Sequence, residues 1–210
     1  MYPKPPIIAM DLEGVLVPEI WIAVSEKTGI AELRLTTRDV PDYDQLMQGR
    51  LAILREHGLK LADIQAVIRT VVPLPGAKEF VDWARSQAQF IILSDTYYEF
   101  AGPLMEKLGW PTLFCNQLET DADDVMVHYH LRQKDGKKHA VAALKGIGFR
   151  VIAVGDSYND TTMLAEADAG ILFHPPENIV AEFPQFPAMN EFDDLRRCIV
   201  EKLQAIPRSL

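Results

Sequence analysis

Acidic and hydroxyl side chains follow three short apolar runs of this sequence, each directly at the end of its run. The first run ends in Asp11 and Glu13, the second in Ser94 and Asp95, and the third in Asp156. Carboxylates held close together raise one another's pKa unless a cation lies between them. Mg²⁺ resolves this repulsion, since it binds a few carboxylates together with phosphate oxygens and water. The pattern therefore predicts a magnesium site that handles phosphate, provided that the three runs end at one place.

A phosphate group at such a site needs hydrogen-bond donors and a further positive charge. Ser94 and the backbone N–H groups at the start of a helix suit a phosphate oxygen. Lys134, in the stretch LRQKDGKK, lies at the entrance to a predicted helix ahead of Asp156. We expect its ammonium group to hold both the phosphate and an attacking carboxylate, with Lys137 and Lys138 as competing candidates.

Five apolar runs have the composition of strands that are buried on both faces of a parallel sheet. They are too short for helices and do not alternate with polar residues. They cover residues 6–12, 89–95, 112–116, 150–156 and 169–173. Helical patterns lie between and after them, at residues 76–87, 98–109, 136–148, 160–167 and 193–204. This alternation predicts a doubly wound α/β fold, whose ligands bind beyond the carboxyl ends of the strands.

One long segment departs from this alternation. Residues 18–73 contain no convincing strand and instead show three amphipathic helices, at residues 18–30, 43–58 and 61–71. We therefore predict an α/β core made of residues 1–17 and 74–210, with residues 18–73 inserted after the first strand as a helical cap. Within the core, residues 118–133 alternate around DADD and predict a β-hairpin. The proline-rich residues 173–189 predict irregular surface.

Composition limits the possible partners and compartments. The 210 residues include 21 basic and 30 acidic side chains, and the net charge of −9 argues against a nucleic-acid surface. No apolar run reaches the roughly 18 residues that a membrane span needs. The first ten residues lack the pattern of a signal peptide. With only Cys115 and Cys198 as cysteines, we expect a cytoplasmic protein. The oligomeric state is left open.

Taken together, these residues resemble the haloacid dehalogenase superfamily of phosphotransferases. Its four motifs occur in order along the chain, as DLEGV, IILS, Lys134 and GDSYND. The helical insert is similar to the cap of the phosphoserine phosphatase branch. The stretches DLEGVLVPEIW and GDSYNDTTML resemble more closely those of bacterial bifunctional phosphoserine phosphatase/homoserine phosphotransferases, which also carry Glu at the second acidic position of the first motif.

The resemblance implies a covalent mechanism. Asp11 would attack phosphorus and form an aspartyl phosphate. Mg²⁺ would be held by Asp11, by the backbone carbonyl of Glu13 and by Asp156. Lys134 and Ser94 would hold the phosphate oxygens, and Glu13 would move the proton to the leaving oxygen and from the acceptor.

Further residues receive supporting roles from the same resemblance. In the cap, Glu19 would bind the amino group of the substrate and Arg50 its carboxylate. Asp160 would act from behind the metal ligands by orienting a metal-bound water or the lysine. Other polar residues next to the motifs are expected to contact the substrate, namely Asp95, Thr96 and Asn159. Tyr158 is equally compatible with lining the pocket and with packing.

The activity implied is Mg²⁺-dependent hydrolysis of phosphoserine, with transfer of the phosphoryl group to homoserine as a second reaction. These reactions would belong to serine and threonine biosynthesis. Homoserine is one methylene longer than serine, a difference worth only ~1–3 kcal/mol in a pocket. Two alternatives stay open: a phosphatase of the same superfamily for a sugar phosphate or nucleotide, and a phosphoacceptor signalling domain. The helical insert argues against the signalling domain, and the complete set of acids argues against a catalytically silent binding module.

Overall fold

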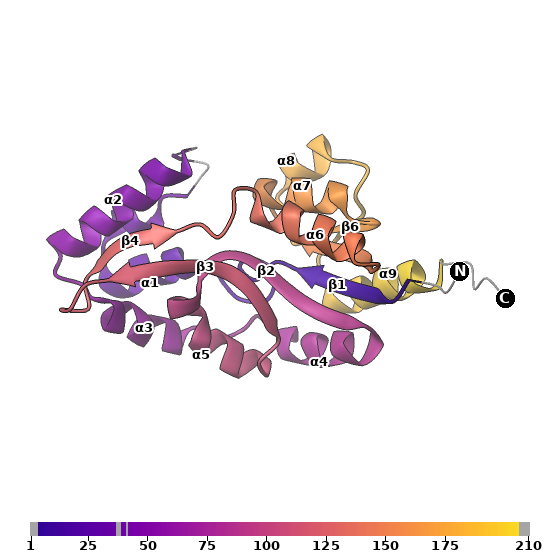
Figure 1. The fold of residues 1–210 in the computed structure, drawn as a ribbon, viewed down its shortest axis with the longest axis horizontal. Coiled ribbons are helices and arrows are strands. Elements are labelled where there is room, and N and C mark those ends of the chain that lie inside the picture. The colour runs from indigo at the N-terminus through magenta and orange to yellow at the C-terminus, as the bar shows by residue number, and fades with distance from the viewer. Residues whose placement is uncertain (1–3, 37–38, 41, 206–210) are drawn as a thin grey trace.

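A seven-stranded sheet forms the centre of the molecule (Figure 1). The computed structural model describes residues 4–36, 39–40 and 42–205. The strand order is β4-β3-β2-β1-β5-β6-β7. All neighbouring strands run parallel except β3 and β4. The strands are β1 (Pro6–Met10), β2 (Gln89–Tyr97), β3 (Thr112–Thr120), β4 (Met126–His130), β5 (Arg150–Gly155), β6 (Ala169–Phe173) and β7 (Ala188–Met189). The predicted doubly wound α/β fold is confirmed.

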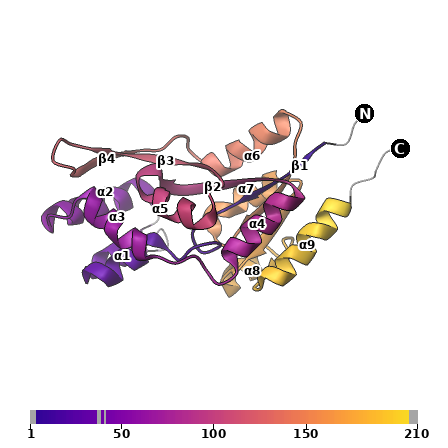
Figure 2. The ribbon, with the colours of Figure 1, turned by 90° about the horizontal axis from the view of Figure 1, so that it is seen from below.

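Helices cover both faces of the central part of this sheet, which explains why β1, β5 and β6 carry consecutive apolar residues. Successive residues of β1 point to opposite faces. Ile8 and Met10 therefore belong to the apolar cluster under α4 and α9, whereas Ile7 and Ala9 belong to the cluster under α6 and α7. Figure 2 shows α4 and α9 on one side of the sheet and α6 on the other. The core helices are α4 (Ala77–Gln87), α5 (Tyr98–Leu108), α6 (Gly136–Gly146), α7 (Tyr158–Glu166), α8 (Glu177–Glu182) and α9 (Phe192–Gln204).

The position of β1 brings the polar strand ends together. β1 pairs with β2 on one side and with β5 on the other, and all three run in the same direction. Their carboxyl ends are therefore adjacent, and the chain leaves them in different directions. This is the switch point at which open α/β sheets bind their ligands.

The segment between β1 and α4 is helical. It contains α1 (Ile20–Thr28), the 3₁₀ helix η1 (Ala31–Arg34), α2 (Tyr43–Glu56) and α3 (Leu61–Thr70). In Figure 1 these helices lie beyond one end of the sheet, next to the β3–β4 hairpin. Apolar side chains of the insert, such as Val24, Leu54 and Ile64, continue the same cluster that covers one face of the sheet.

A proline in α5 is used to attach the insert to the core. Pro103 lies inside the helix and has no N–H to donate to the carbonyl of Glu99 four residues earlier. The Gln65 side chain on α3 donates to this carbonyl at 2.7 Å. A polar group that the proline leaves unpaired is thus satisfied by the insert.

The β3–β4 hairpin and residues 173–189 differ in part from what the sequence predicts. The predicted hairpin is present, but its first strand continues the predicted strand at 112–116, so that β3 is one long strand. The expectation of irregular surface at 173–189 is wrong for two stretches, which form α8 and β7. There Ile179 is fully buried, and β7 pairs with β6 as an added edge strand. No helix in the described part of the chain is long and apolar enough to cross a bilayer.

Candidate active site

The loop after β1 places Asp11 at the centre of the strand-end cluster. Its backbone N–H donates to the carbonyl of Val154 at 2.9 Å, so the ladder with β5 extends to Asp11. The residue is only 4% exposed. Gly14 lets the loop turn back, because it has a φ of +74° and because a Cβ there would lie 2.5 Å from a carboxylate oxygen of Asp156. Any other residue at position 14 would push the two acidic loops apart.

A buried lysine holds these loops together. The Nζ atom of Lys137 lies 2.9 Å from Oδ1 of Asp11, 2.8 Å from Oδ1 of Asp160 and 3.7 Å from Oδ2 of Asp95. Burial lowers the pKa of Lys137, but the charges of Asp11 and Asp160 outweigh it and raise this pKa well above its ordinary value. Lys137 is therefore a permanent cation at the site.

This placement corrects the expectation for Lys134. Lys134 is exposed in the loop before α6, whereas Lys137 is buried in the first turn of that helix. The helix begins at Gly136 and packs on the sheet, so its first turn faces the carboxyl ends of the strands. Lys138, the next residue, is half-buried and has no ion pair among the described residues.

The loop after β5 and the first turn of α7 supply two further carboxylates. Asp156 is nearly buried, and Asp160 is completely buried. Oδ2 of Asp160 accepts hydrogen bonds from the backbone N–H groups of Asp156 at 2.9 Å and Ser157 at 3.2 Å. Ser157 and Asp160 form a capping box at the start of α7. A Cβ on Gly155 would lie 2.4 Å from the Asp160 side chain, so this glycine allows the close approach.

Three of these carboxylates form a group that could hold a metal ion. Oxygen atoms of Asp11, Asp156 and Asp160 all lie within 4.8 Å of one another. Burial, together with the charge of Asp160, raises the pKa of Asp11 well above its ordinary value and that of Asp156 to about 7. A divalent cation removes this repulsion, and an all-oxygen donor set suits Mg²⁺. These residues thus fit the expected Mg²⁺. The group of three carboxylates includes Asp160, and it does not include the side chain of Glu13.

The carboxyl-end half of β2 borders this group. Ser94 is buried, and its Oγ accepts a hydrogen bond from the backbone N–H of Thr96 at 3.2 Å. The Asp95 side chain accepts a hydrogen bond from Nδ2 of Asn159 at 2.9 Å. Asp95 therefore links the end of β2 to the first turn of α7, next to Lys137.

Glu13 lies where the core meets the insert. Its Oε2 accepts a hydrogen bond from the backbone N–H of Ile20, at the start of α1, at 2.8 Å. Burial and the charge of Glu19 raise the pKa of Glu13 to about 8. At neutral pH this side chain can therefore carry a proton. Glu19 itself is exposed at the N-cap position of α1.

Arg50 reaches the same region from α2. Its guanidinium group lies over the Trp21 ring, 4.5 Å from the ring centroid, and Nη2 donates to the carbonyl of Leu35 at 2.7 Å. The side chain is buried, and its Nε has no hydrogen-bond partner among the described residues. The charge of Arg50 also lowers the pKa of Glu13, although burial and Glu19 outweigh it. Arg50 is thus a buried cation with an unused donor near the acid.

Sequence reasoning missed two residues at this junction, Tyr43 and Tyr97. Their hydroxyl oxygens lie 2.8 Å apart, one on α2 and the other at the end of β2. A signal for Tyr43 was present, because it lies seven residues before Arg50 and therefore on the same helix face. The sequence contains no such signal for Tyr97, because an aromatic residue at the end of a strand is common.

Comparisons with known proteins agree with this geometry. The chain is 66% identical over 191 residues to a phosphoserine phosphatase of Pseudomonas syringae pv. tomato. The aligned residues make up 91% of this chain and 81% of that protein. It is 64% identical over 204 residues to phosphoserine phosphatase ThrH of Pseudomonas aeruginosa, covering 97% of this chain and 98% of that protein.

A solved phosphoserine phosphatase in its apo form has the same fold, with a TM-score of 0.75 at 20% identity over 93% of this chain and 98% of that chain. A family model for haloacid dehalogenase-like hydrolases matches residues 6–168, which include every acidic residue of the strand-end cluster. The chain therefore belongs to the haloacid dehalogenase-like hydrolase family.

Proposed function

We propose that this chain is a Mg²⁺-dependent phosphoserine phosphatase that also transfers the phosphoryl group from phosphoserine to homoserine. The observation that carries the proposal is the buried Asp11, held 2.9 Å from the Lys137 ammonium and beside Asp156 and Asp160. The names of the two bacterial relatives at 66% and 64% identity support phosphoserine as the donor. Transfer to homoserine is proposed from the resemblance of DLEGVLVPEIW and GDSYNDTTML to the bifunctional enzymes.

In the first half-reaction, a carboxylate oxygen of Asp11 attacks phosphorus, and the bond between phosphorus and the serine oxygen breaks. The proton that Glu13 carries moves to the departing oxygen, which leaves as a neutral hydroxyl group. The pKa of about 8 for Glu13 supports this role, because the acid is then protonated at neutral pH.

In the second half-reaction, an acceptor hydroxyl attacks the phosphorus of the aspartyl phosphate and gives its proton to Glu13. The bond between Asp11 and phosphorus breaks, which restores the carboxylate. Water as the acceptor yields phosphate, and homoserine yields phosphohomoserine. Most of the barrier is lowered by positioning and by charge, since the transferring group spreads its charge over three oxygens.

Lys137 takes the role that the sequence analysis gave to Lys134, because it is the lysine in contact with Asp11. Ser94 would bind a phosphate oxygen beside it. Asp11, Asp156 and the backbone carbonyl of Glu13 would hold Mg²⁺, which when bound neutralises charge on the phosphate and the carboxylates. Asp160 fixes Lys137 at 2.8 Å and so acts through it.

The insert would recognise the amino-acid part of the substrate. Arg50 offers its buried guanidinium to the carboxylate, and Glu19 at the N-cap of α1 offers a negative charge to the ammonium group. Asp95, Thr96 and Asn159 would contact the substrate from the side of the sheet. We propose that residues 18–73 act as the cap in this sense, and that the enzyme works in the cytoplasm on small molecules.

An assay with phosphoserine, in the presence and absence of homoserine, tests the function directly. Free phosphate should be released without homoserine, and phosphohomoserine should form when homoserine is added. EDTA should stop both reactions, and added Mg²⁺ should restore them. A sugar phosphate and a nucleotide serve as comparison donors; if phosphoserine is turned over no faster than these, the proposed donor is wrong.

Replacing Arg50 with Ala should raise KM for phosphoserine much more than KM for a phosphate ester that has no carboxylate. KM for phosphoserine should rise about 10- to 100-fold, because a hydrogen bond to a charged group contributes roughly 1.5–3 kcal/mol to binding. Steady-state kinetics with phosphoserine and p-nitrophenyl phosphate measures the difference. Arg55→Ala, at the exposed end of the same helix, is the matched control. Equal effects on both substrates would remove Arg50 from carboxylate binding.

A further inference from the structure

Two tyrosine hydroxyl groups join the insert to the sheet beside the active site. Tyr43 is the first residue of α2, and Tyr97 is the last residue of β2. Their oxygens lie 2.8 Å apart, and the Tyr43 oxygen also lies 3.5 Å from the carbonyl of Asp95. The bonds thus connect a helix of the insert to the strand that carries Ser94.

Charged groups of the candidate site lie near the pair. Tyr43, Met47 and Arg50 share one face of α2, and Nη1 of Arg50 lies 3.5 Å from the Met47 sulfur. Burial raises the pKa of Tyr43 to about 12, while the charges of Asp95, Arg50 and Glu13 are close enough to act on it. Burial also raises the pKa of Tyr97, so both hydroxyl groups stay protonated and act as donors.

Aromatic rings hold the pair in place. Tyr129 of β4 meets the Tyr43 ring edge to face at 5.8 Å between centroids, and the Tyr97 ring at 6.4 Å. The Tyr129 hydroxyl donates to Asp44 of α2 at 2.6 Å. On its other side, Tyr97 meets Phe100 at 5.6 Å. Rings from β2, β4, α2 and α5 therefore restrict the side chains of Tyr43 and Tyr97, so that their hydroxyl groups keep one arrangement.

We propose that the Tyr43–Tyr97 hydroxyl pair holds α2 against the end of β2 that carries Ser94 and Asp95, and makes the enzyme favour an alcohol over water as phosphoryl acceptor. This inference rests on the proposed function, because it concerns the second half-reaction. One hydroxyl donates to the other, and the Tyr43 hydroxyl also reaches the Asp95 carbonyl at 3.5 Å, so the junction between insert and sheet is closed by direct hydrogen bonds. Both tyrosines are positioning residues here, since neither is required to contact phosphorus.

Removing one of the two hydroxyl groups should weaken the preference for an alcohol over water. The remaining hydroxyl and the Asp95 carbonyl would then be two polar groups next to a gap, which is the setting in which proteins bind an ordered water. The charge of Glu13 acts on the Tyr43 hydroxyl, so a water bound at this point is within electrostatic reach of the base that activates the acceptor. Hydrolysis and transfer break the same bond between Asp11 and phosphorus. The choice between them therefore depends on whether water or homoserine lies next to Glu13 when this bond breaks.

The test is the ratio of transfer to hydrolysis in Tyr43→Phe and Tyr97→Phe. With p-nitrophenyl phosphate as donor and homoserine as acceptor, nitrophenol counts all turnovers, free phosphate counts hydrolysis and phosphohomoserine counts transfer. Both variants should lower the ratio roughly three- to tenfold, the effect of one ordinary hydrogen bond. Because each ratio comes only from active molecules, partial unfolding of a variant does not change it.

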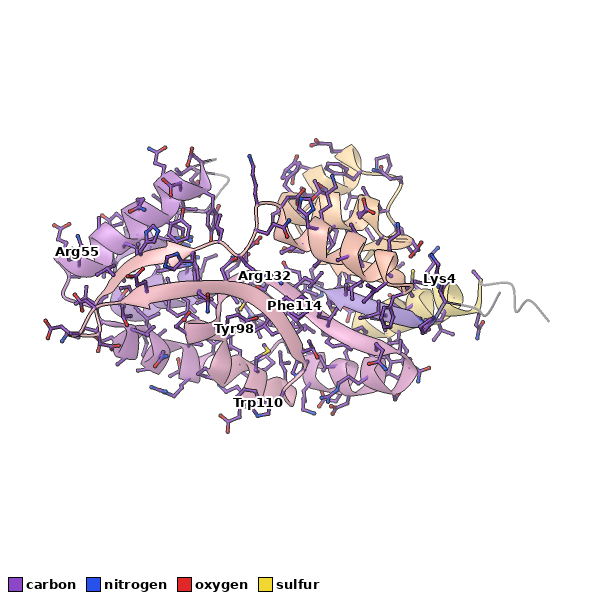
Figure 3. The ribbon with its side chains drawn as sticks, in the orientation of Figure 1. Lys4, Arg55, Tyr98, Trp110, Phe114 and Arg132 are labelled. Atoms are coloured by element: carbon purple, nitrogen blue, oxygen red, sulfur yellow. The ribbon has the colours of Figure 1, made fainter. Side chains whose placement is uncertain are left out.

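Tyr98→Phe is the matched control. Its hydroxyl donates to the carbonyl of Leu113 at 3.2 Å, beside β3 and outside the pair (Figure 3), so the ratio should stay at the wild-type value. An unchanged ratio in both Tyr43→Phe and Tyr97→Phe overturns the inference, as does a wild-type protein that transfers nothing to homoserine. The donor keeps the two proposals apart: a wild type that partitions with p-nitrophenyl phosphate but does not use phosphoserine refutes only the proposed donor.

Discussion

Replacing Asp11 with Asn is expected to abolish turnover of every phosphate ester while leaving the protein folded. The amide cannot attack phosphorus, and loss of a nucleophile lowers kcat on the order of 10⁴-fold or more. The fold should survive, because Lys137 keeps its 2.8 Å contact with Asp160. Burial and the nearby Asp160 already raise the pKa of Asp11, so its charge is not what stabilises the folded chain. Phosphate release and thermal unfolding measure the two effects.

A trapping experiment sharpens this result. Wild-type protein that is denatured during turnover of ³²P-labelled phosphoserine should retain label on the chain, whereas Asp11→Asn should retain none. Asp63→Asn, an exposed acid on α3, controls for the substitution itself and should retain as much label as the wild type. Turnover by Asp11→Asn within tenfold of the wild type would show that another group attacks phosphorus.

Replacing Lys137 with Ala should damage both activity and stability, whereas replacing Lys134 should damage neither. Without Lys137, Asp11 and Asp160 remain buried beside each other with no cation, and breaking such a buried pair costs about 3–5 kcal/mol. Loss of a preorganised charge at the phosphate should lower kcat about 10²- to 10³-fold. Lys134 is exposed, and surface substitutions usually change the free energy of unfolding by less than about 0.5 kcal/mol.

Urea unfolding and phosphoserine turnover on the two variants separate these expectations. Added Mg²⁺ should restore part of the stability of Lys137→Ala, because a cation that binds only the folded protein stabilises it. A large loss of activity in Lys134→Ala, together with a mild effect in Lys137→Ala, would return the catalytic role to Lys134.

Much of the site follows from the chain order of strands and acids. Runs that are apolar on both faces must lie inside a parallel sheet, and parallel strands present their carboxyl ends at one edge. For this reason the order of residues is enough to expect Asp11, Ser94 and Asp156 at one place. The helical character of residues 18–73 was equally visible, because strand-like runs are missing there.

The choice among neighbouring lysines could not be made in the same way. Lys134, Lys137 and Lys138 differ by only a few positions, and each fits a helix entrance. What decides between them is the residue at which α6 begins and the side on which its first turn packs. Sequence patterns place such boundaries to within only a few residues, which is enough to exchange an exposed lysine for a buried one.

The sequence by itself thus determined the fold class, the acidic groups and the insert, because these depend on hydrophobic pattern and on residue order. Only the tertiary structure decided that Lys137 contacts Asp11 and that Tyr43 meets Tyr97. Those two contacts join residues that are 126 and 54 positions apart in the chain. No local pattern records such a pairing, since it exists only when separate elements pack to within hydrogen-bonding distance.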